Sequence, residues 1–284
     1  MGNLIAVFDS NSISIAGSTE LAFIEDVAKR YDAYGWHVIE INGHSAEEIE
    51  GAYGAALAVL DKPTLIIAKT EIGKGSPNKV GTSDSHGSPL GEEEITKTKQ
   101  AIGWDYAESF YVPDEVKNLF KARKQQLEQS FQVWNEKFSS WKKSEASQAK
   151  ILEQLINKKI PSSLENDLQE LANKLAQKPV ATRKISGEML QVIASQVPSL
   201  IGGSADLEPS TLTYIKSSSA IQKENFEGIN IHFGVREHAM AAIQNGFAYF
   251  GGYIPFGSTF FCFADYMKPS IRLAALSGLQ SIYV

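Results

Sequence analysis

Glu237 lies where a predicted strand gives way to a predicted helix. Residues 229–233 are rich in β-branched side chains, Gly234 predicts a turn, and a helix rich in Ala and Met begins at Arg236. Ligands of open α/β sheets collect at strand ends, and a carboxylate in a first helical turn is stabilised as the anion. Glu237 is therefore a candidate proton acceptor at neutral pH. Taken alone, however, this stretch favours a plainer interpretation, in which Glu237 is only a favourable first-turn acid.

Asn11 follows another predicted strand, the apolar run at residues 4–8. A Mg2+ ion bound to a diphosphate takes oxygen ligands in octahedral geometry. The side-chain oxygen of Asn11 and the main-chain oxygen of Ile13 can both reach one such ion. An Asp-x-Asn sequence after a strand is also a common turn, and this short pattern by itself favours the turn.

His86 lies in a long loop, residues 71–91, which contains five glycines, two prolines and few apolar residues. Long loops inside compact domains are usually functional or disordered. A histidine among Ser, Gly and Asp side chains can donate to a phosphate, act as a general acid–base or remain solvated. The loop by itself favours the solvated state for His86.

Two further groups of residues have side chains that suit a ligand. Arg183 with Ser210 suits a sugar phosphate, because a guanidinium makes paired hydrogen bonds that fix a phosphate dianion. The plainer interpretation of Arg183 is a surface cation near a helix start. Phe260, Phe263 and Tyr266 have a spacing that is usual for aromatic residues of a core.

The elements that must position these residues alternate between strand and helix along most of the chain. This order predicts an α/β protein with parallel, doubly wound sheets. The residue pattern predicts strands at 4–8, 36–41, 65–68, 200–206, 229–233, 253–261 and 280–284, and helices at 18–34, 45–60, 113–143, 182–197, 236–250 and 264–276, with a further helix starting at 91.

The composition excludes several classes of protein. Hydrophobic residues make up 43% and charged residues 21%, which is typical of a globular protein. The net charge of -6 provides no basic surface for nucleic acid or for an anionic membrane. The N-terminal stretch predicts neither a signal peptide nor a transit peptide. The single cysteine, Cys262, excludes an internal disulfide, suits a reducing cytosol and, among aromatic neighbours, is predicted to be a small core residue.

Taken together, several of these segments resemble the transketolase family. They follow the family's order along the whole chain and read FDSNSISIAG, IGKGSPNKVGTSDSHGSPLG, ATRKISG, GGSADLEPS, GVREHAMAAIQNG and STFFCFADY. The resemblance implies the thiamine-diphosphate-binding fold. It also implies the C-terminal part of a diphosphate-binding domain at 1–105, a helical linker at 106–180 and the N-terminal part of a pyrimidine-binding domain at 181–284. The family's Gly-Asp-Gly motif, whose aspartate is a metal ligand, is not in this sequence, so we expect an internal fragment.

For the diphosphate-binding part, the resemblance implies a role for each candidate residue. Asn11 and the main-chain oxygen of Ile13 would bind Mg2+, or Ca2+ in its place, and Ile15 would pack against thiamine diphosphate. His86 would contact the diphosphate and the substrate and would take part in catalysis. Ser83 stands where many relatives have another histidine, and nothing essential depends on that change.

For the pyrimidine-binding part, the resemblance implies that Glu237 is catalytic and shares a proton with the aminopyrimidine ring of thiamine diphosphate. Arg183 and Ser210 would hold the substrate phosphate. An apolar wall around the ring would exclude water. The further cofactor contacts that the resemblance implies are Asp206, Phe260, Phe263 and Tyr266.

The activity implied by the resemblance is transfer of a two-carbon ketol unit from a ketose phosphate to an aldose phosphate, in the pentose phosphate pathway, with thiamine diphosphate as electron sink. Family members are homodimers that hold each cofactor between two subunits. We therefore expect sugar phosphates and a second copy of the chain as partners, a cytoplasmic location, and no nucleic acid or membrane. Without the aspartate ligand, we expect no activity from the chain alone.

Two alternatives stay open. Another thiamine-diphosphate enzyme, such as dihydroxyacetone synthase or a deoxyxylulose-phosphate synthase, shares much of the pattern, although Arg183 with Ser210 favours a sugar-phosphate ketolase. A non-catalytic interaction or scaffold remnant is an alternative of a different class. The DNA sequence on either side of the coding segment separates that alternative from an enzyme.

Overall fold

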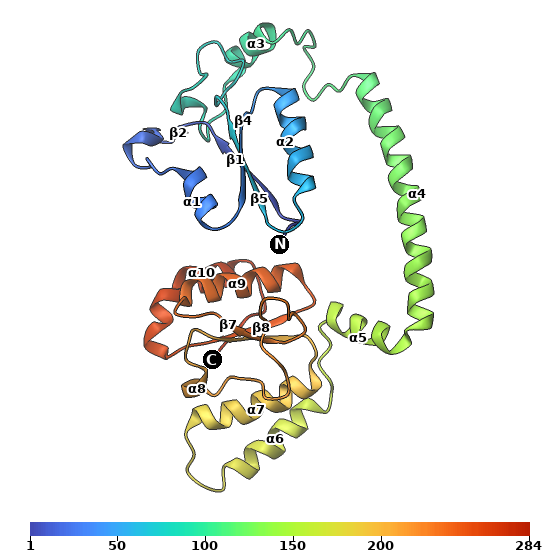
Figure 1. Cartoon of the computed structure of the whole chain (residues 1–284), viewed down its shortest axis with the longest axis vertical. Helices are drawn as coiled ribbons and strands as arrows, with labels where there is room; N and C mark the ends of the chain where they lie inside the picture. Colours follow the sequence, from blue (N-terminus) through green and yellow to red (C-terminus); the bar gives the residue numbers. More distant parts are fainter. The chain divides into compact units, whose positions relative to one another are not determined.

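The computed structural model describes residues 1–284, which divide into two compact units, Met1–Lys117 and Asn118–Val284. Each unit contains one parallel sheet with helices packed beside it, as Figure 1 shows. The α/β class with parallel sheets, predicted from the sequence, is therefore confirmed. None of the helices combines the length and the apolar character that crossing a bilayer requires.

The sheet of the first unit has the strand order β1-β5-β4, and all three strands are parallel. The middle strand is buried from Thr64 to Ala68, as its nearly continuous apolar run requires of a central parallel strand. In the register, Lys69 lies opposite both Ser10 and Asn42, so the three strands end at the same edge. The strands are β1 (Ile5–Ser10), β4 (His37–Asn42) and β5 (Thr64–Lys69).

Helix α2 (Ala46–Ala58) shows how closely local sequence signals determine a boundary in this unit. The hydroxyl of Ser45 accepts a hydrogen bond from the backbone N–H of Glu48 at 3.2 Å, an N-cap arrangement at the start of the helix predicted for 45–60. Ala52 and Ala56 then pack against the apolar side chains of the sheet. The other elements of the unit are β2 (Ile13–Ser14), β3 (Gly17–Ser18), η1 (Thr19–Leu21), α1 (Val27–Ala33), η2 (Ser83–Ser85) and α3 (Glu92–Ala101).

The helix predicted at 18–34 is wrong in its first half. The hydroxyl of Ser18 accepts from the N–H of Glu20 and begins only the short 3-10 turn η1. The chain is then extended at Asp26, whose carboxylate accepts from the N–H of Lys29 at 3.0 Å and caps α1. Two capping residues therefore occur in one predicted helix, and the second one marks the true start.

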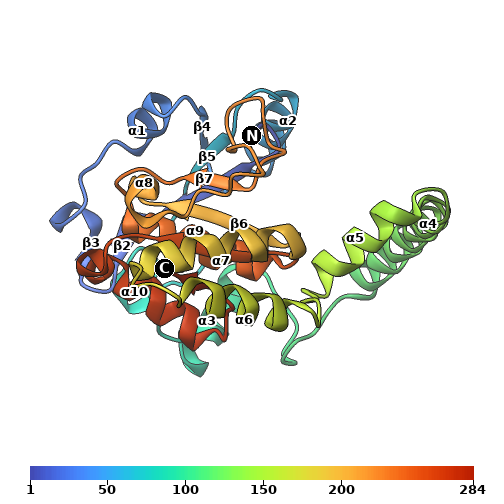
Figure 2. The same cartoon turned by 90° about the horizontal axis from the view of Figure 1, so that it is seen from below.

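The sheet of the second unit has the order β7-β6-β8-β9, again all parallel. Figure 1 shows α9 and α10 on one face of this sheet and α7 with α6 on the other, and Figure 2 shows α6 and α7 side by side. The elements are β6 (Leu200–Ser204), β7 (Asn230–His232), β8 (Ile254–Ser258), β9 (Ile282–Tyr283), α5 (Ala146–Ile156), α6 (Leu164–Leu175), α7 (Thr182–Gln196), α8 (Glu208–Thr211), α9 (Glu237–Phe250), η3 (Phe261–Phe263) and α10 (Ala264–Leu276); α4 (Asp114–Ser144) spans the division between the units.

Helix α9 is fixed by a buried stripe with helical spacing. Met240, Ala241, Gln244, Asn245 and Ala248 are all buried, and they recur on one side of the helix. This packing places the first residue of α9 at the end of β7, as the sequence predicted.

The prediction of a core position for the cysteine is wrong. Cys262 is exposed, because the short turn η3 that contains it lies at the surface.

Candidate functional site

A hollow of about 730 Å³ opens near the carboxyl end of β1 in the first unit. Its lining includes three predicted site residues from two segments far apart in the chain, Asn11, Ile13 and His86. The fold thus brings three of the predicted residues to one place, at the strand ends where ligands of α/β sheets collect. Ile15 is not among the lining residues, and its side chain is 79% exposed.

The turn at Asn11 orients an amide oxygen. The Oδ1 atom of Asn11 accepts a hydrogen bond from the N–H of Ile13 at 3.0 Å, and Ser12 between them has a left-handed φ of 61°. The loop is closed by Thr19, whose N–H donates to the carbonyl of Ser12 at 2.9 Å. Since an amide oxygen has two lone pairs, this turn leaves the second one for another ligand. The turn and a metal ligand, treated as alternatives for Asn11, are compatible.

Charged side chains line other parts of the same hollow. The carboxylate of Asp9 accepts a hydrogen bond from the hydroxyl of Thr70, and Lys69 forms an ion pair with Glu40 at 2.9 Å. The hydrogen bond to Glu40 raises the pKa of Lys69, and the carboxylate of Glu40 offsets its positive charge. Asp9 was not among the predicted site residues, although it directly follows the strand predicted at 4–8, which is the kind of signal that selected Asn11.

A second hollow, of about 340 Å³, lies in the second unit and collects four of the predicted residues. Glu237 is its half-buried carboxylate and the first residue of α9. Asp206 follows β6 with a left-handed φ of 63°, and Phe263 and Tyr266 form the aromatic part of the wall. The hollow therefore combines flat apolar surfaces with carboxylates at one strand-end edge.

The three aromatic residues form a ladder of near-parallel rings. The ring centroids of Phe260 and Phe263 are 6.2 Å apart with an interplanar angle of 19°, and those of Phe263 and Tyr266 are 6.2 Å apart at 28°. Phe260 does not line the hollow but stacks on a residue that does. The rings are not core side chains, because Phe260 is 42% and Tyr266 63% exposed. They offer a surface on which another flat ring can stack.

The buried hydroxyl of Ser204 shapes the turn that carries Asp206. It donates to the carbonyl of Ser258 at 2.9 Å and accepts from the N–H of Leu207 at 3.0 Å, which joins the end of β6 to β8 and to the turn. Ser204 was not among the predicted site residues. Its place at the end of the Gly-Gly-Ser strand was the available signal.

Arg183 and Ser210 are not brought into either of these hollows. Arg183 is exposed at the second position of α7, and Ser210 is half-buried in α8, which packs against α7. A third hollow, of about 390 Å³, is lined by their chain neighbours Lys184 and Pro209. The two residues lie on adjoining helices, and their joint role stays a prediction.

Comparison with protein families assigns both units. Residues 1–161 match the family model described as transketolase, thiamine diphosphate binding domain, and residues 178–284 match the one described as transketolase, pyrimidine binding domain. The chain belongs to the transketolase family. The domain limits 1–105, 106–180 and 181–284 stay a prediction, since neither the two family models nor the two compact units test them.

Transketolases from several organisms are similar to the whole chain. The transketolase of Geobacillus stearothermophilus is 46% identical over 286 residues, and transketolase 2 of Escherichia coli K12 is 43% identical over 287 residues. All of this chain is covered in both cases, but only 42% and 43% of these relatives' lengths. A transketolase from Pichia stipitis, solved in complex with sedoheptulose-7-phosphate, has a TM-score of 0.88 and 39% identity, covering 99% of this chain and 42% of that structure.

Family membership confirms thiamine diphosphate as the cofactor class of these domains. The donor sets of the two hollows fit that cofactor. Oxygen ligands at Asn11 and Ile13 suit Mg2+, which normally takes few protein ligands and completes its shell with phosphate oxygens and water. The aromatic wall beside Glu237 suits a flat heterocycle with a ring nitrogen.

Proposed function

We propose that this chain supplies residues for both ends of a thiamine diphosphate site that transfers two-carbon ketol units between sugar phosphates, the transketolase reaction. The observation that supports this most directly is the division of the predicted residues between two hollows of different chemistry. One hollow is polar and rich in oxygen ligands, and the other is aromatic with carboxylates at its edge. A diphosphate with its metal suits the first, and an aminopyrimidine ring suits the second.

In the first hollow, Asn11 and the main-chain oxygen of Ile13 hold Mg2+ against the diphosphate. His86, which lines the same hollow, donates a hydrogen bond to the diphosphate or to a substrate hydroxyl. Lys69, paired with Glu40, completes the polar lining at this edge. These residues bind and orient, while the metal neutralises phosphate charge.

In the second hollow, Glu237 holds a proton between its carboxylate and the pyrimidine ring nitrogen. Its carboxylate is half-buried in the first turn of α9 and lines this hollow. Phe263 and Tyr266 stack beside the ring and keep water from it. When bound, thiamine diphosphate supplies the electron sink that allows a carbon–carbon bond next to a carbonyl to break.

Sugar phosphates are the proposed substrates, and a second copy of the chain is the proposed partner. The complex of the Pichia stipitis relative with sedoheptulose-7-phosphate supports the substrate class. Arg183 and Ser210 hold the phosphate, with the guanidinium providing paired hydrogen bonds. The two half-sites meet between two copies of the chain, in the cytoplasm.

Calorimetric titration of the full chain with thiamine diphosphate and Mg2+ tests the proposal. Binding should be saturable, and Glu237→Gln or His86→Ala should each weaken it about 10- to 100-fold, since each removes a hydrogen bond to a charged or proton-sharing group. Glu165→Gln makes the same chemical change in an exposed first turn of α6 and should leave affinity unchanged. Absence of saturable binding, or equal affinity for all four proteins, would contradict the proposal.

A further inference from the structure

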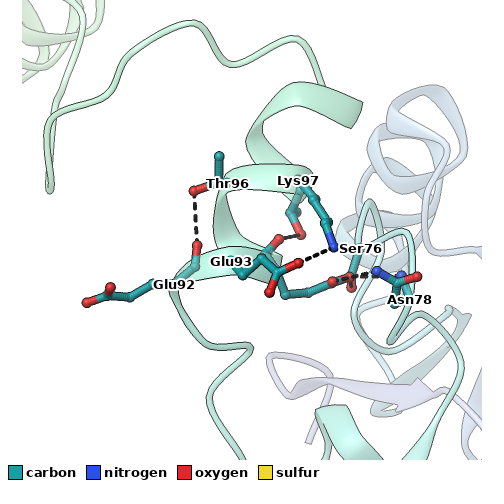
Figure 3. Close-up of polar contacts among 8 residues, drawn as sticks. Ser76, Asn78, Glu92, Glu93, Thr96 and Lys97 are labelled. Carbon is teal, nitrogen blue, oxygen red and sulfur yellow. Dashed lines mark hydrogen bonds and ion pairs between the residues drawn. The ribbon is translucent and has the colours of Figure 1, made fainter.

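Glu94 is a buried charged residue in the first turn of α3. Its exposed fraction is 7%, while Glu92 and Glu93 before it are exposed. A buried carboxylate is unstable unless hydrogen-bond donors surround it. Figure 3 shows where the donors come from: Ser76 and Asn78, both in the long glycine-rich loop that precedes the helix.

Three donors converge on this one carboxylate. The hydroxyl of Ser76 and the backbone N–H of Asn78 donate to its Oε1, the latter at 2.8 Å, and the side-chain amide of Asn78 donates to its Oε2 at 2.8 Å. The hydrogen bond from Ser76, followed by those from Asn78, lowers the pKa of Glu94 to about 2. An ionised carboxylate accepts hydrogen bonds and donates none, so its chemistry matches the three donors. The side chain thus ties the loop to α3.

Further hydrogen bonds connect Ser76 through the loop towards His86. The hydroxyl of Ser76 also accepts from the N–H of Lys79 at 3.1 Å. The carbonyl of Lys79 in turn accepts from the hydroxyl of Ser85 at 2.7 Å, and Ser85 is the residue directly before His86. Hydrogen bonds joined through the backbone of Lys79 therefore link the carboxylate of Glu94 to the hydroxyl of Ser85, next to His86.

Close packing strengthens the same link. Gly73 has a left-handed φ of 68°, and a Cβ atom there would lie 2.6 Å from the Oγ of Ser85 and 3.1 Å from the carbonyl oxygen of Lys79. The hydroxyl of Thr82 adds a second donor to that carbonyl, at 2.9 Å. These contacts hold Gly73, Lys79 and Ser85 against one another, so we expect a movement near Ser76 to reach Ser85.

The carboxylate of Glu94 does not cap the N-terminus of its own helix, α3. The N-cap residue of α3 is Gly91, which makes no side-chain capping hydrogen bond. All hydrogen bonds to the carboxylate of Glu94 come from the loop. We propose that Glu94 is a positioning residue that holds residues 72–90 of the glycine-rich loop (loop 72–90) in the conformation that presents His86 to the first hollow. The importance of that position for ligand binding rests on the function proposed above for His86.

Glu94→Gln in the full chain tests the proposal with little change of shape. The amide keeps one acceptor but replaces the other with an NH2 group that faces the donors of Asn78. Glu93→Gln is the matched control, because Glu93 belongs to the same turn, is exposed and pairs with Lys97 at 2.6 Å (Figure 3). Circular dichroism and hydrogen exchange of β5 check that both variants remain folded.

Two measurements report on positioning without any ligand. In Glu94→Gln, hydrogen exchange of the amides at 72–90 should become about tenfold faster or more, because a charge-assisted contact is lost. The imidazole resonances of His86 in the NMR spectrum should shift at the same time. Both should stay at wild-type values in Glu93→Gln. Wild-type exchange and unshifted His86 resonances in Glu94→Gln would overturn the proposal.

A second variant and a binding measurement separate the two proposals. Ser76→Ala should reproduce the effects of Glu94→Gln, and the double variant should add little to either, whereas fully additive effects would contradict a shared path. Glu94→Gln should weaken binding of thiamine diphosphate with Mg2+ in the wild-type background and have no further effect in His86→Ala. If the wild-type chain binds no cofactor, the proposed function fails, but exchange and His86 resonances still decide the role of Glu94.

Discussion

The two hollows of this chain are held in place by different means. In the first unit, Asn11 and His86 lie in loops shaped by short polar side chains: the Oδ1 of Asn11 accepts a hydrogen bond in one loop, and the hydroxyl of Ser85 donates one in the other. In the second unit, Glu237 lies at the start of a helix whose buried face packs into the core through Met240 and Ala241. Polar contacts dominate the first arrangement, and apolar packing dominates the second.

This difference suits the ligand end that each hollow is proposed to bind. A diphosphate with its metal needs several oxygen and nitrogen atoms in defined positions, and a loop provides these from its backbone and side chains. A flat ring needs a rigid apolar wall and one well-placed carboxylate, which a helix start beside stacked aromatic residues provides. Changes to polar loop residues should therefore act locally in the first unit, and core changes should act on the whole second unit.

Met240→Ala should have the largest effect. Met240 is fully buried at the centre of a cluster with Ala205, Phe233 and Met267. Truncation should lower the free energy of unfolding of the second unit by about 2–5 kcal/mol. Urea-dependent hydrogen exchange of β6 and α9 amides measures this, with the half-exposed Leu273→Ala of α10 as control. A change below that of the control would show that packing does not hold the second hollow.

Gly257→Ala should have the next largest effect. A Cβ atom on this buried residue of β8 would lie 2.7 to 2.8 Å from side-chain atoms of Gln244, which is itself 1% exposed. Overpacking here should lower the stability of the second unit by about 1–3 kcal/mol. Gly246→Ala on α9 meets no atom within 4 Å and should instead raise stability by up to about 1 kcal/mol. Equal effects of the two variants on hydrogen exchange would count against the close contact.

The stability that the hydrogen bonds between Glu94 and the loop contribute should depend on pH only under acidic conditions. The pKa of Glu94 falls from 4.5 to about 2 on folding, so the unfolded chain binds more protons between these two pH values. The stabilising contribution of Glu94 should be complete above about pH 4.5 and lost as the pH falls towards 2. The amide shift of Asn78 in NMR spectra should titrate with a midpoint near pH 2. A midpoint near 4.5 would mean that the carboxylate is not held by the loop.

Lys97→Ala should have the smallest effect. Lys97 pairs with Glu93 on the exposed side of α3, and exposed ion pairs contribute little because water and salt screen them. Hydrogen exchange in loop 72–90 should match the wild type. Faster exchange on removal of this ammonium group would mean that the net charge of the first turn of α3, rather than Glu94 itself, orders the loop.

The parts of the fold predicted well are those with local signals. Ser45 and Glu237 mark helix starts by their own residue types and immediate neighbours, and both helices begin where predicted. The helix predicted at 18–34 failed because Ser18 and Asp26 are both capping residues, and their relative strength depends on tertiary contacts. Local signals thus placed most elements but could not choose between two competing starts.

The candidate site shows the same limit. Residues at strand ends, such as Asn11 and Glu237, were found because the topology of each unit brings such positions to one edge of its own sheet. Glu94 was missed because it sits in a run of three glutamates that looks like an ordinary acidic first turn. Only the return of Ser76 and Asn78 to the helix distinguishes it, and no pattern within the turn contains that information.

The surface position of Cys262 has a practical consequence. The chain has no other cysteine, and this one is exposed directly before Phe263, a residue of the aromatic ladder beside the second hollow. A thiol-reactive fluorophore would therefore attach at a single point near the proposed ring site. Its emission would give a real-time optical signal of occupancy there, without a tag, a second label or any turnover.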